Sequence, residues 1–228
     1  MLHLHVRDKQ QQHTLDADCY RAAMTAVRAR VGDSLVLQVT SEAVDAYTRE
    51  EQMAMVRALR PEAVSLGLRE LCPDDKAEVE AAAFFAWLRK EQIWPQYILY
   101  SADDVSRFDR MRRRGVFTDE HPFCLLVMGR YSEALEGNLS ELTAMLEAAD
   151  CNEFPWAVCC FGRFENEAML AATDTGGHVR IGFENNLSLP DGSVARDNAQ
   201  LINHYRSSAT SYGRIPATAD DIRNECMN

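Results

Sequence analysis

The chain has 228 residues, of which 46% are hydrophobic, and its formal net charge is −11. This length suits a single domain over residues 1–228, because single α/β barrels commonly reach about 250 residues. The negative charge argues against nucleic acid or an anionic membrane as a partner, since phosphate groups repel such a surface. There is neither an apolar run long enough to cross a bilayer nor a signal peptide, so we expect a cytoplasmic protein.

The first predicted element is a strand over residues 2–7, which carries His3 and His5 in an apolar run. Side chains two positions apart in a strand point to the same face. Two imidazoles on one face form a pair suited to a transition metal, although an isolated pair of this kind is more often structural.

The rest of the chain alternates between amphipathic and continuous apolar segments. Helices are predicted over residues 16–31, 48–60, 75–92, 102–114, 138–150, 164–174, 197–211 and 218–226. Ser101 or Asp103 is expected to cap the helix at 102. Further strands are predicted over residues 34–40, 62–66, 97–100, 123–128, 156–161 and 179–183. Apolar strands that alternate with amphipathic helices indicate a parallel sheet covered by helices.

Seven strand–helix units favour an α/β fold of the TIM (β/α)8 type, which needs eight units when closed. The expected missing unit would precede residue 1. An open doubly wound sheet is the alternative, but it usually has a glycine-rich phosphate loop after its first strand. Residues 7–13 contain no glycine, so the barrel is the favoured interpretation.

The segment from Gly176 to Asn186 is a second stretch with several polar residues. If it continues as a strand, Arg180, Gly182 and Glu184 share one face, and Gly182 leaves room beside the Arg180 guanidinium. His178 is expected to be a hydrogen-bonded core residue lower on that face. Glu184 follows the strand at its C-terminal end, where barrel active sites are built.

In a barrel that lacks its first unit, the last strand and the His3 strand flank the gap and face one cavity. His3, His5 and Glu184 then supply two imidazoles and one carboxylate, which is a ligand set of catalytic zinc. Such an ion acts as a Lewis acid on a carbonyl and stabilises an enolate.

Two further groups of residues have simpler interpretations. The seven cysteines show no CxxC spacing, and we interpret them as reduced, mostly buried thiols. Five arginines between residues 107 and 114 fit a solvated helix end, with a nucleotide-phosphate anchor as the alternative.

Several segments resemble the β-keto acid cleavage enzymes across essentially the whole chain. They are Leu2–Asp8, Leu59–Leu66, Gly176–Asn186, Pro190–Gly192, Ala195–Leu201 and Ile215–Thr218. The resemblance implies a TIM barrel, zinc bound by His3, His5 and Glu184, and a homo-oligomer. It implies a Claisen-type condensation of a β-keto acid with acetyl-CoA, which gives acetoacetate and a new acyl-CoA.

The resemblance also implies roles for individual residues in the catalytic pocket. Arg180 matches the family arginine near the catalytic base, and Thr40 or Ser41 matches a pocket hydroxyl. Asn185 stands at the base position, where the family has Asp, and an amide cannot take a proton at neutral pH. Gln96 and Ile98 stand where acidic residues are usual, which points away from an amino-substituted keto acid.

These departures leave two alternatives to the condensation. One is a metal-assisted hydrolase or lyase on the same scaffold that does not need CoA, and Asn185 prompts it. The other is a truncated, non-catalytic family member, because a seven-unit barrel would expose unpaired strand edges.

Overall fold

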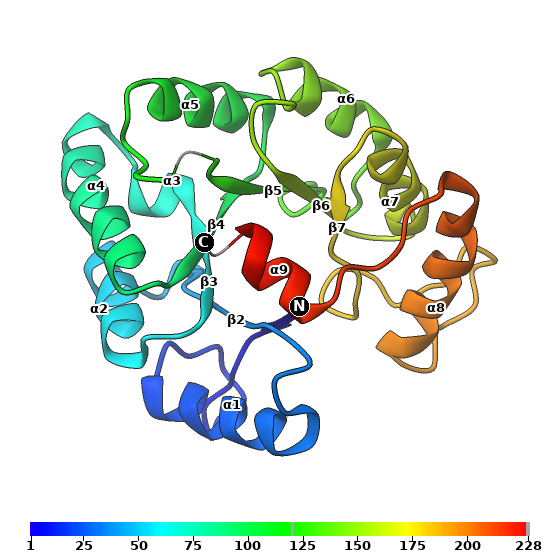
Figure 1. The fold of residues 1–228 in the computed structure, drawn as a ribbon. Coiled ribbons are helices and arrows are strands. Elements are labelled where there is room, and N and C mark those ends of the chain that lie inside the picture. The colour runs from blue at the N-terminus through cyan, green and yellow to red at the C-terminus, as the bar shows by residue number, and fades with distance from the viewer. Residues whose placement is uncertain (120, 227–228) are drawn as a thin grey trace. The chain divides into compact units, whose positions relative to one another are not determined.

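The computed structural model describes residues 1–119 and 121–226. Within these residues, seven strands form one sheet in the chain order β1-β2-β3-β4-β5-β6-β7. The pairs β1–β2, β2–β3, β5–β6 and β6–β7 are parallel. Figure 1 shows strands alternating with helices along the chain, which confirms the predicted parallel α/β fold.

The chain divides into two compact units, and β4 and α5 each contribute residues to both. Unit 1 comprises residues 1–97, 112–122 and 217–228, and unit 2 comprises residues 98–111 and 123–216.

Unit 1 contains the N-terminal strands and the C-terminal helix. Its elements are β1 (Leu2–Leu4), α1 (Ala17–Val31), β2 (Leu37–Thr40), α2 (Arg49–Leu59), β3 (Ala63–Gly67), α3 (Leu68–Leu71), α4 (Asp75–Lys90), most of β4 (Trp94–Leu99) and α9 (Ala219–Cys226). Side-chain caps define the helix starts. Asp16 accepts the backbone N–H groups of Asp18 and Cys19, and Thr48 forms a capping box with Glu51.

Unit 2 contains the C-terminal half of the sheet. Its elements are most of α5 (Ala102–Arg113), β5 (Phe123–Met128), α6 (Leu139–Glu147), β6 (Trp156–Cys160), α7 (Glu165–Asp174), β7 (His178–Val179), α8 (Asn198–Ala209) and a 3-10 turn over Thr210–Tyr212. Ser101 caps α5, because its hydroxyl accepts the N–H of Asp104 at 3.2 Å.

Each unit has its own apolar core. In unit 1 the Tyr97 ring packs between Phe85 and Phe117, with ring centroids 5.1 and 4.5 Å away. In unit 2, Phe108 meets Phe154 at a centroid distance of 5.1 Å. β5 and β6 are buried along their whole lengths, as expected for parallel strands covered on both faces.

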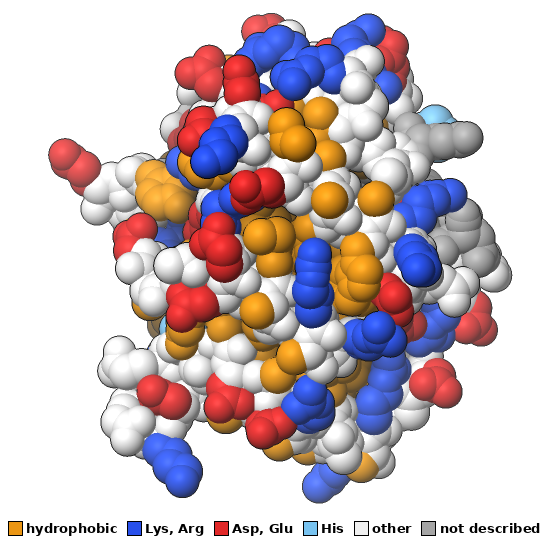
Figure 2. All heavy atoms as spheres, turned by 90° about the vertical axis from the view of Figure 1, so that its left-hand side faces the viewer, with side chains coloured by type: hydrophobic (Ala, Val, Ile, Leu, Met, Phe, Trp, Pro, Cys, Tyr) orange, Lys and Arg blue, Asp and Glu red, His pale blue; other side chains and the backbone are white. Residues whose placement is uncertain are grey.

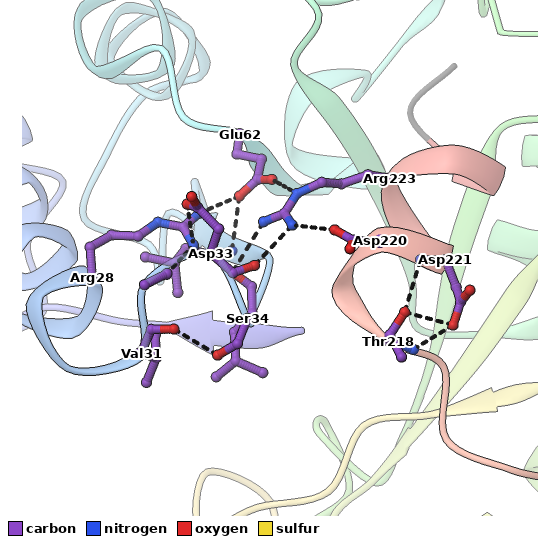
Figure 3. Close-up of polar contacts among 12 residues, drawn as sticks. Arg28, Val31, Asp33, Ser34, Glu62, Thr218, Asp220, Asp221 and Arg223 are labelled. Atoms are coloured by element: carbon purple, nitrogen blue, oxygen red, sulfur yellow. Dashed lines mark hydrogen bonds and ion pairs between the residues drawn. The ribbon is translucent and has the colours of Figure 1, made fainter.

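Helix α9 is held to the rest of unit 1 by a cluster of partly buried ion pairs (Figure 3). Arg223 donates from Nε to Glu62 Oε1 at 2.7 Å, and Arg28 donates from Nη2 to Glu62 Oε2 at 2.5 Å. Burial alone would raise the pKa of Glu62, but hydrogen bonds from Arg223 and the Leu37 backbone outweigh it and lower that pKa. A segment at the end of the chain is thereby tied to the start of β3.

Charges of both signs are mixed on the face that Figure 2 draws. Figure 2 shows acidic and basic side chains interspersed with apolar ones on the face that carries α2 and α4. Arg114 belongs to the arginine-rich stretch, and it forms an ion pair with the buried Glu78 at 3.1 Å, which favours a structural role. No helix in the described part of the chain is long and apolar enough to span a membrane.

Two sequence predictions about the last strand are wrong. β7 ends at Val179, so Arg180, Gly182 and Glu184 lie in the loop after it and not along one strand face. Hydrogen bonds from this loop to distant side chains replace the ladder. Gly182 donates its N–H to Glu165, and Phe183 donates its N–H to Asn198. His178 is exposed and not a core residue.

The cysteine prediction is confirmed for the described thiols. Six cysteines are free, and Cys72, Cys124, Cys159 and Cys160 are buried. The side chain of Cys226 lies outside the described part of the chain.

Candidate functional site

Each unit contains one group of candidate functional residues, and the group in unit 1 centres on the histidine pair. His3 lies in β1 and His5 directly after it, and their Nε2 atoms are 3.1 Å apart. Two nitrogens that share a tetrahedral zinc ion at about 2.05 Å lie about 3.3 Å apart. The spacing of this donor pair therefore fits two ligands of one zinc ion.

A glutamine in the neighbouring strand holds His3. In the register of β1 and β2, His3 lies opposite Gln38, and His3 Nδ1 is 2.8 Å from Gln38 Oε1. An imidazole that donates from Nδ1 keeps its lone pair at Nε2, the atom that faces His5. Sequence reasoning missed Gln38, because it is one polar residue inside an apolar strand.

The predicted pocket hydroxyls are fully buried in unit 1, and backbone groups engage both. Thr40 accepts the N–H of Glu42 at its Oγ1 at 3.1 Å, and Ser41 donates to the carbonyl of Ser65 at 3.4 Å. Ser65 lies opposite Thr40 in the β2–β3 register. Its buried hydroxyl has no hydrogen-bond partner among the described residues. A buried hydroxyl of this kind is a group that a substrate oxygen can satisfy.

Glu70 is a second residue that sequence reasoning missed. It follows β3 in α3, and its Oε2 accepts the N–H of Ala43 at 3.0 Å. Burial raises the pKa of Glu70 to about 7, and the charges of Glu42 and Asp45 contribute. It therefore changes protonation near neutral pH.

The second group lies in the loop after β7 in unit 2. Arg180 reaches Cys159 Sγ at 3.3 Å and Glu184 Oε1 at 3.4 Å through its Nη2. Its Nε is buried and has no hydrogen-bond partner within the described residues. Burial opposes the charge, but Cys159 and Glu184 outweigh it and raise the pKa of Arg180, so the guanidinium stays charged. Burial also raises the pKa of Cys159 to about 11, so the thiol is neutral.

The loop that carries Glu184 is organised by one buried carboxyl. Glu165, only 2% exposed, accepts the N–H of Gly182 at 3.2 Å and the Asn186 amide at 3.1 Å. Burial raises the pKa of Glu165, and a further hydrogen bond from the Asn185 side chain opposes the shift. Sequence reasoning missed Glu165, because its partners Gly182 and Asn186 lie 17 and 21 positions away.

Asn185 is buried beside these groups. Its Nδ2 donates to the Arg180 carbonyl at 3.4 Å, and its Oδ1 has no hydrogen-bond partner in the part of the chain that the structure describes. In this loop the buried Arg180 Nε–H is a donor able to bind an oxyanion, whereas the Glu184 carboxylate and Asn185 Oδ1 are acceptors.

Comparisons with known proteins identify the family of the chain. A family model described as beta-keto acid cleavage enzyme matches residues 1–226. The 3-keto-5-aminohexanoate cleavage enzyme of Acetoanaerobium sticklandii is 25% identical over 228 residues, which cover 98% of this chain and 82% of that protein. The 3-oxoadipate:acetyl-CoA acetyltransferase of Cupriavidus necator is 22% identical over 98% of this chain and 79% of that protein.

Solved structures support the fold. The binary complex of ObcA with oxaloacetate has a TM-score of 0.73 at 15% identity. The match covers 98% of this chain and 62% of that one, so the present chain spans less than two thirds of it. A type I 3-dehydroquinate dehydratase from Clostridium difficile has a TM-score of 0.56 at 12% identity.

Proposed function

The chain belongs to the β-keto acid cleavage enzyme family, and on that premise we propose that it condenses a β-keto acid with acetyl-CoA to give acetoacetate and a new acyl-CoA. Its relatives are named for β-keto acid cleavage and for acetyl transfer, so the chain is an acyltransferase-type enzyme that cleaves carbon–carbon bonds. The proposed scaffold is a single TIM-type barrel domain. A homo-oligomeric state and a cytoplasmic location stay predictions.

We propose that His3, His5 and Glu184 bind Zn²⁺. The observation that carries this proposal is the 3.1 Å approach of the two histidine Nε2 atoms, with Nδ1 of His3 engaged by Gln38. A bound zinc ion would polarise the keto carbonyl and stabilise negative charge on its oxygen. Glu184 Oε1 lies 3.4 Å from Arg180 Nη2, so a neighbouring cation orients this carboxylate.

Arg180 is proposed to hold the carboxylate of the β-keto acid and the charge of its enolate. Its buried Nε, which has no partner within the described residues, is a donor that a substrate oxygen would satisfy. Gly182 adds no side chain to this loop. Thr40, Ser41 and Gly182 stay predicted substrate-binding residues.

Asn185 is proposed to position the substrate and not to remove a proton from it. An amide donates and accepts hydrogen bonds but has no basicity at neutral pH. This residue supports a second candidate function, a metal-assisted hydrolase or lyase that acts without CoA.

The proposed substrate has no amino group. Gln96 is 5% exposed, and its Oε1 accepts a hydrogen bond from Gln38 Nε2 at 3.2 Å. Ile98, also buried, carries no charge. Neither residue can neutralise a substrate ammonium, so we expect a neutral or acidic acyl chain to be preferred.

The deciding experiment uses acetyl-CoA labelled with carbon-13 in its acetyl group, together with 3-oxoadipate or 3-keto-5-aminohexanoate. The proposal predicts labelled acetoacetate and a new acyl-CoA, with 3-oxoadipate turned over faster. Loss of keto acid without acetyl-CoA would instead establish the hydrolase or lyase. Absence of turnover by zinc-loaded protein with a panel of neutral, acidic and amino-substituted keto acids would indicate a non-catalytic member.

A further inference from the structure

Two buried glutamine side chains connect the histidine pair to the interior of unit 1. Gln38, fully buried in β2, bonds through Oε1 to His3 Nδ1 at 2.8 Å. Its Nε2 donates to Gln96 Oε1 in β4 at 3.2 Å, and Gln96 is 5% exposed. β1, β2 and β4 thus contribute one side chain each to a continuous hydrogen-bonded chain, which we call the glutamine relay.

The glutamine relay has a defined polarity. Gln96 accepts from the Gln38 amide nitrogen, which orients the Gln38 oxygen toward His3. Only a protonated Nδ1 can donate to that oxygen. A neutral His3 ring then has its lone pair at Nε2, 3.1 Å from Nε2 of His5.

Gln38 places a polar amide among apolar side chains. Gln38 follows Val36 and Leu37 and precedes Val39, all of which are fully buried. Burying an amide costs free energy unless its groups are hydrogen-bonded, and an aliphatic side chain would avoid that cost. The relay satisfies the Gln38 amide through two partners, one of them a histidine.

We propose that Gln38 and Gln96 are positioning residues that fix the tautomer and ring orientation of His3, so that Nε2 is its metal-binding atom. The link to metal rests on the proposed function, whereas the tautomer is a property of the metal-free chain. Groups that orient a ligating histidine through its second nitrogen typically change metal affinity 10- to 100-fold when removed.

The test begins with histidine nitrogen-15 NMR of the metal-free protein, which distinguishes the two neutral tautomers. We expect His3 to be protonated at Nδ1 in the wild type and to lose this preference in Gln38→Met. Gln38→Glu keeps an acceptor for Nδ1 and should preserve the tautomer. Gln52→Met is the matched control, because Gln52 is also a buried amide of unit 1 but contacts Ser41 and Glu70.

Zinc affinity is measured on the same variants by competition with a chelating dye. We expect Gln38→Met to bind about 10- to 100-fold more weakly and Gln96→Met several-fold more weakly, since it removes only the second link. Gln38→Glu and Gln52→Met should stay within a few-fold of the wild type.

The outcomes separate the relay from the proposed function. Protonation of His3 at Nε2 in the wild type, or an unchanged tautomer in Gln38→Met, would overturn the relay. The expected tautomers without any zinc binding would support the relay and count against the zinc enzyme. If Gln38→Met does not fold, the wild-type spectrum and Gln38→Glu still decide the question.

Discussion

At the residue scale, Glu70 is the carboxyl in unit 1 that titrates near neutral pH. Burial raises its pKa from the ordinary value of 4.5 to about 7, and the hydrogen bond from Ala43 only partly opposes that shift. The pKa of Glu70 is higher in the folded state than in the unfolded state. The contribution of Glu70 to stability is therefore fully present below about pH 4.5. That contribution is lost as the pH rises through 7.

Replacement of this carboxyl by an amide should remove the pH dependence. Glu70→Gln keeps an acceptor for the Ala43 N–H but does not ionise. We expect the free energy of unfolding of the variant to exceed that of the wild type by about 1–2 kcal/mol at pH 8, after allowance for solvent screening. At pH 5 the difference should be much smaller. Urea unfolding of both proteins at the two pH values measures the difference, and an equal difference at both would contradict the role of the charge.

A second residue-scale prediction concerns the proton transfer that Asn185 cannot perform. Asn185→Asp places a carboxylate beside Arg180 and should speed deuterium exchange at the α-carbon of a bound keto acid, measured by proton NMR. A positioned base typically raises the rate of proton transfer 100- to 10,000-fold, and we expect the exchange rate to rise at least about 10-fold here.

Asn186→Asp is the control for that substitution, because it adds the same charge one residue further along the chain. Asn186 donates to Glu165 and to the Ser188 carbonyl. Equal exchange rates for the two variants and the wild type would show that position 185 does not face the reacting carbon.

At the element scale, helix α9 depends on the contacts of one arginine. Arg223 bonds to Glu62, to Asp220 and to the carbonyls of Asp33 and Leu35, so it joins α9 to β3 and to the loop before β2 (Figure 3). Its side chain and that of Glu62 are 24% and 21% exposed. Partly buried ion pairs of this kind contribute more than surface pairs.

Arg223→Met should therefore lower the free energy of unfolding by about 1–3 kcal/mol. Arg223→Lys keeps the charge but not the planar guanidinium, so it should lower the free energy of unfolding by less. The control is Arg196→Met, since Arg196 is 80% exposed and pairs with its neighbour Asp197. Urea unfolding measures all three, and a loss in Arg223→Met no larger than the control would show that the cluster does not hold α9.

The positions of helices and strands show how much of the fold the sequence predicts. Continuous apolar runs and amphipathic stretches located most strands and helices, because these patterns act locally, as does the Ser101 cap of α5. β7 ended early because Glu165 and Asn198, both distant in sequence, accept backbone N–H groups of its loop. The glutamine relay was missed for a similar reason, since only the strand register brings Gln38 to His3. Local patterns locate elements, whereas the partners of single polar side chains depend on the tertiary fold.

At the scale of the whole molecule, the proposed zinc ligands His3, His5 and Glu184 come from opposite ends of the sequence. An ion bound by this set adds its binding free energy to folding. Zinc should consequently raise the free energy of unfolding.

Thermal unfolding with and without zinc tests this ligand set. At a free zinc concentration about 100 times the Kd, stabilisation should be about 2.7 kcal/mol, which raises the Tm by roughly 5–10 °C for a chain of this length. His5→Ala and Glu184→Gln should each remove most of this rise, whereas the exposed His204→Ala should keep it. A full rise in Glu184→Gln combined with none in His5→Ala would mean that the histidine pair binds zinc without Glu184. The ligand set would then have to be reassigned.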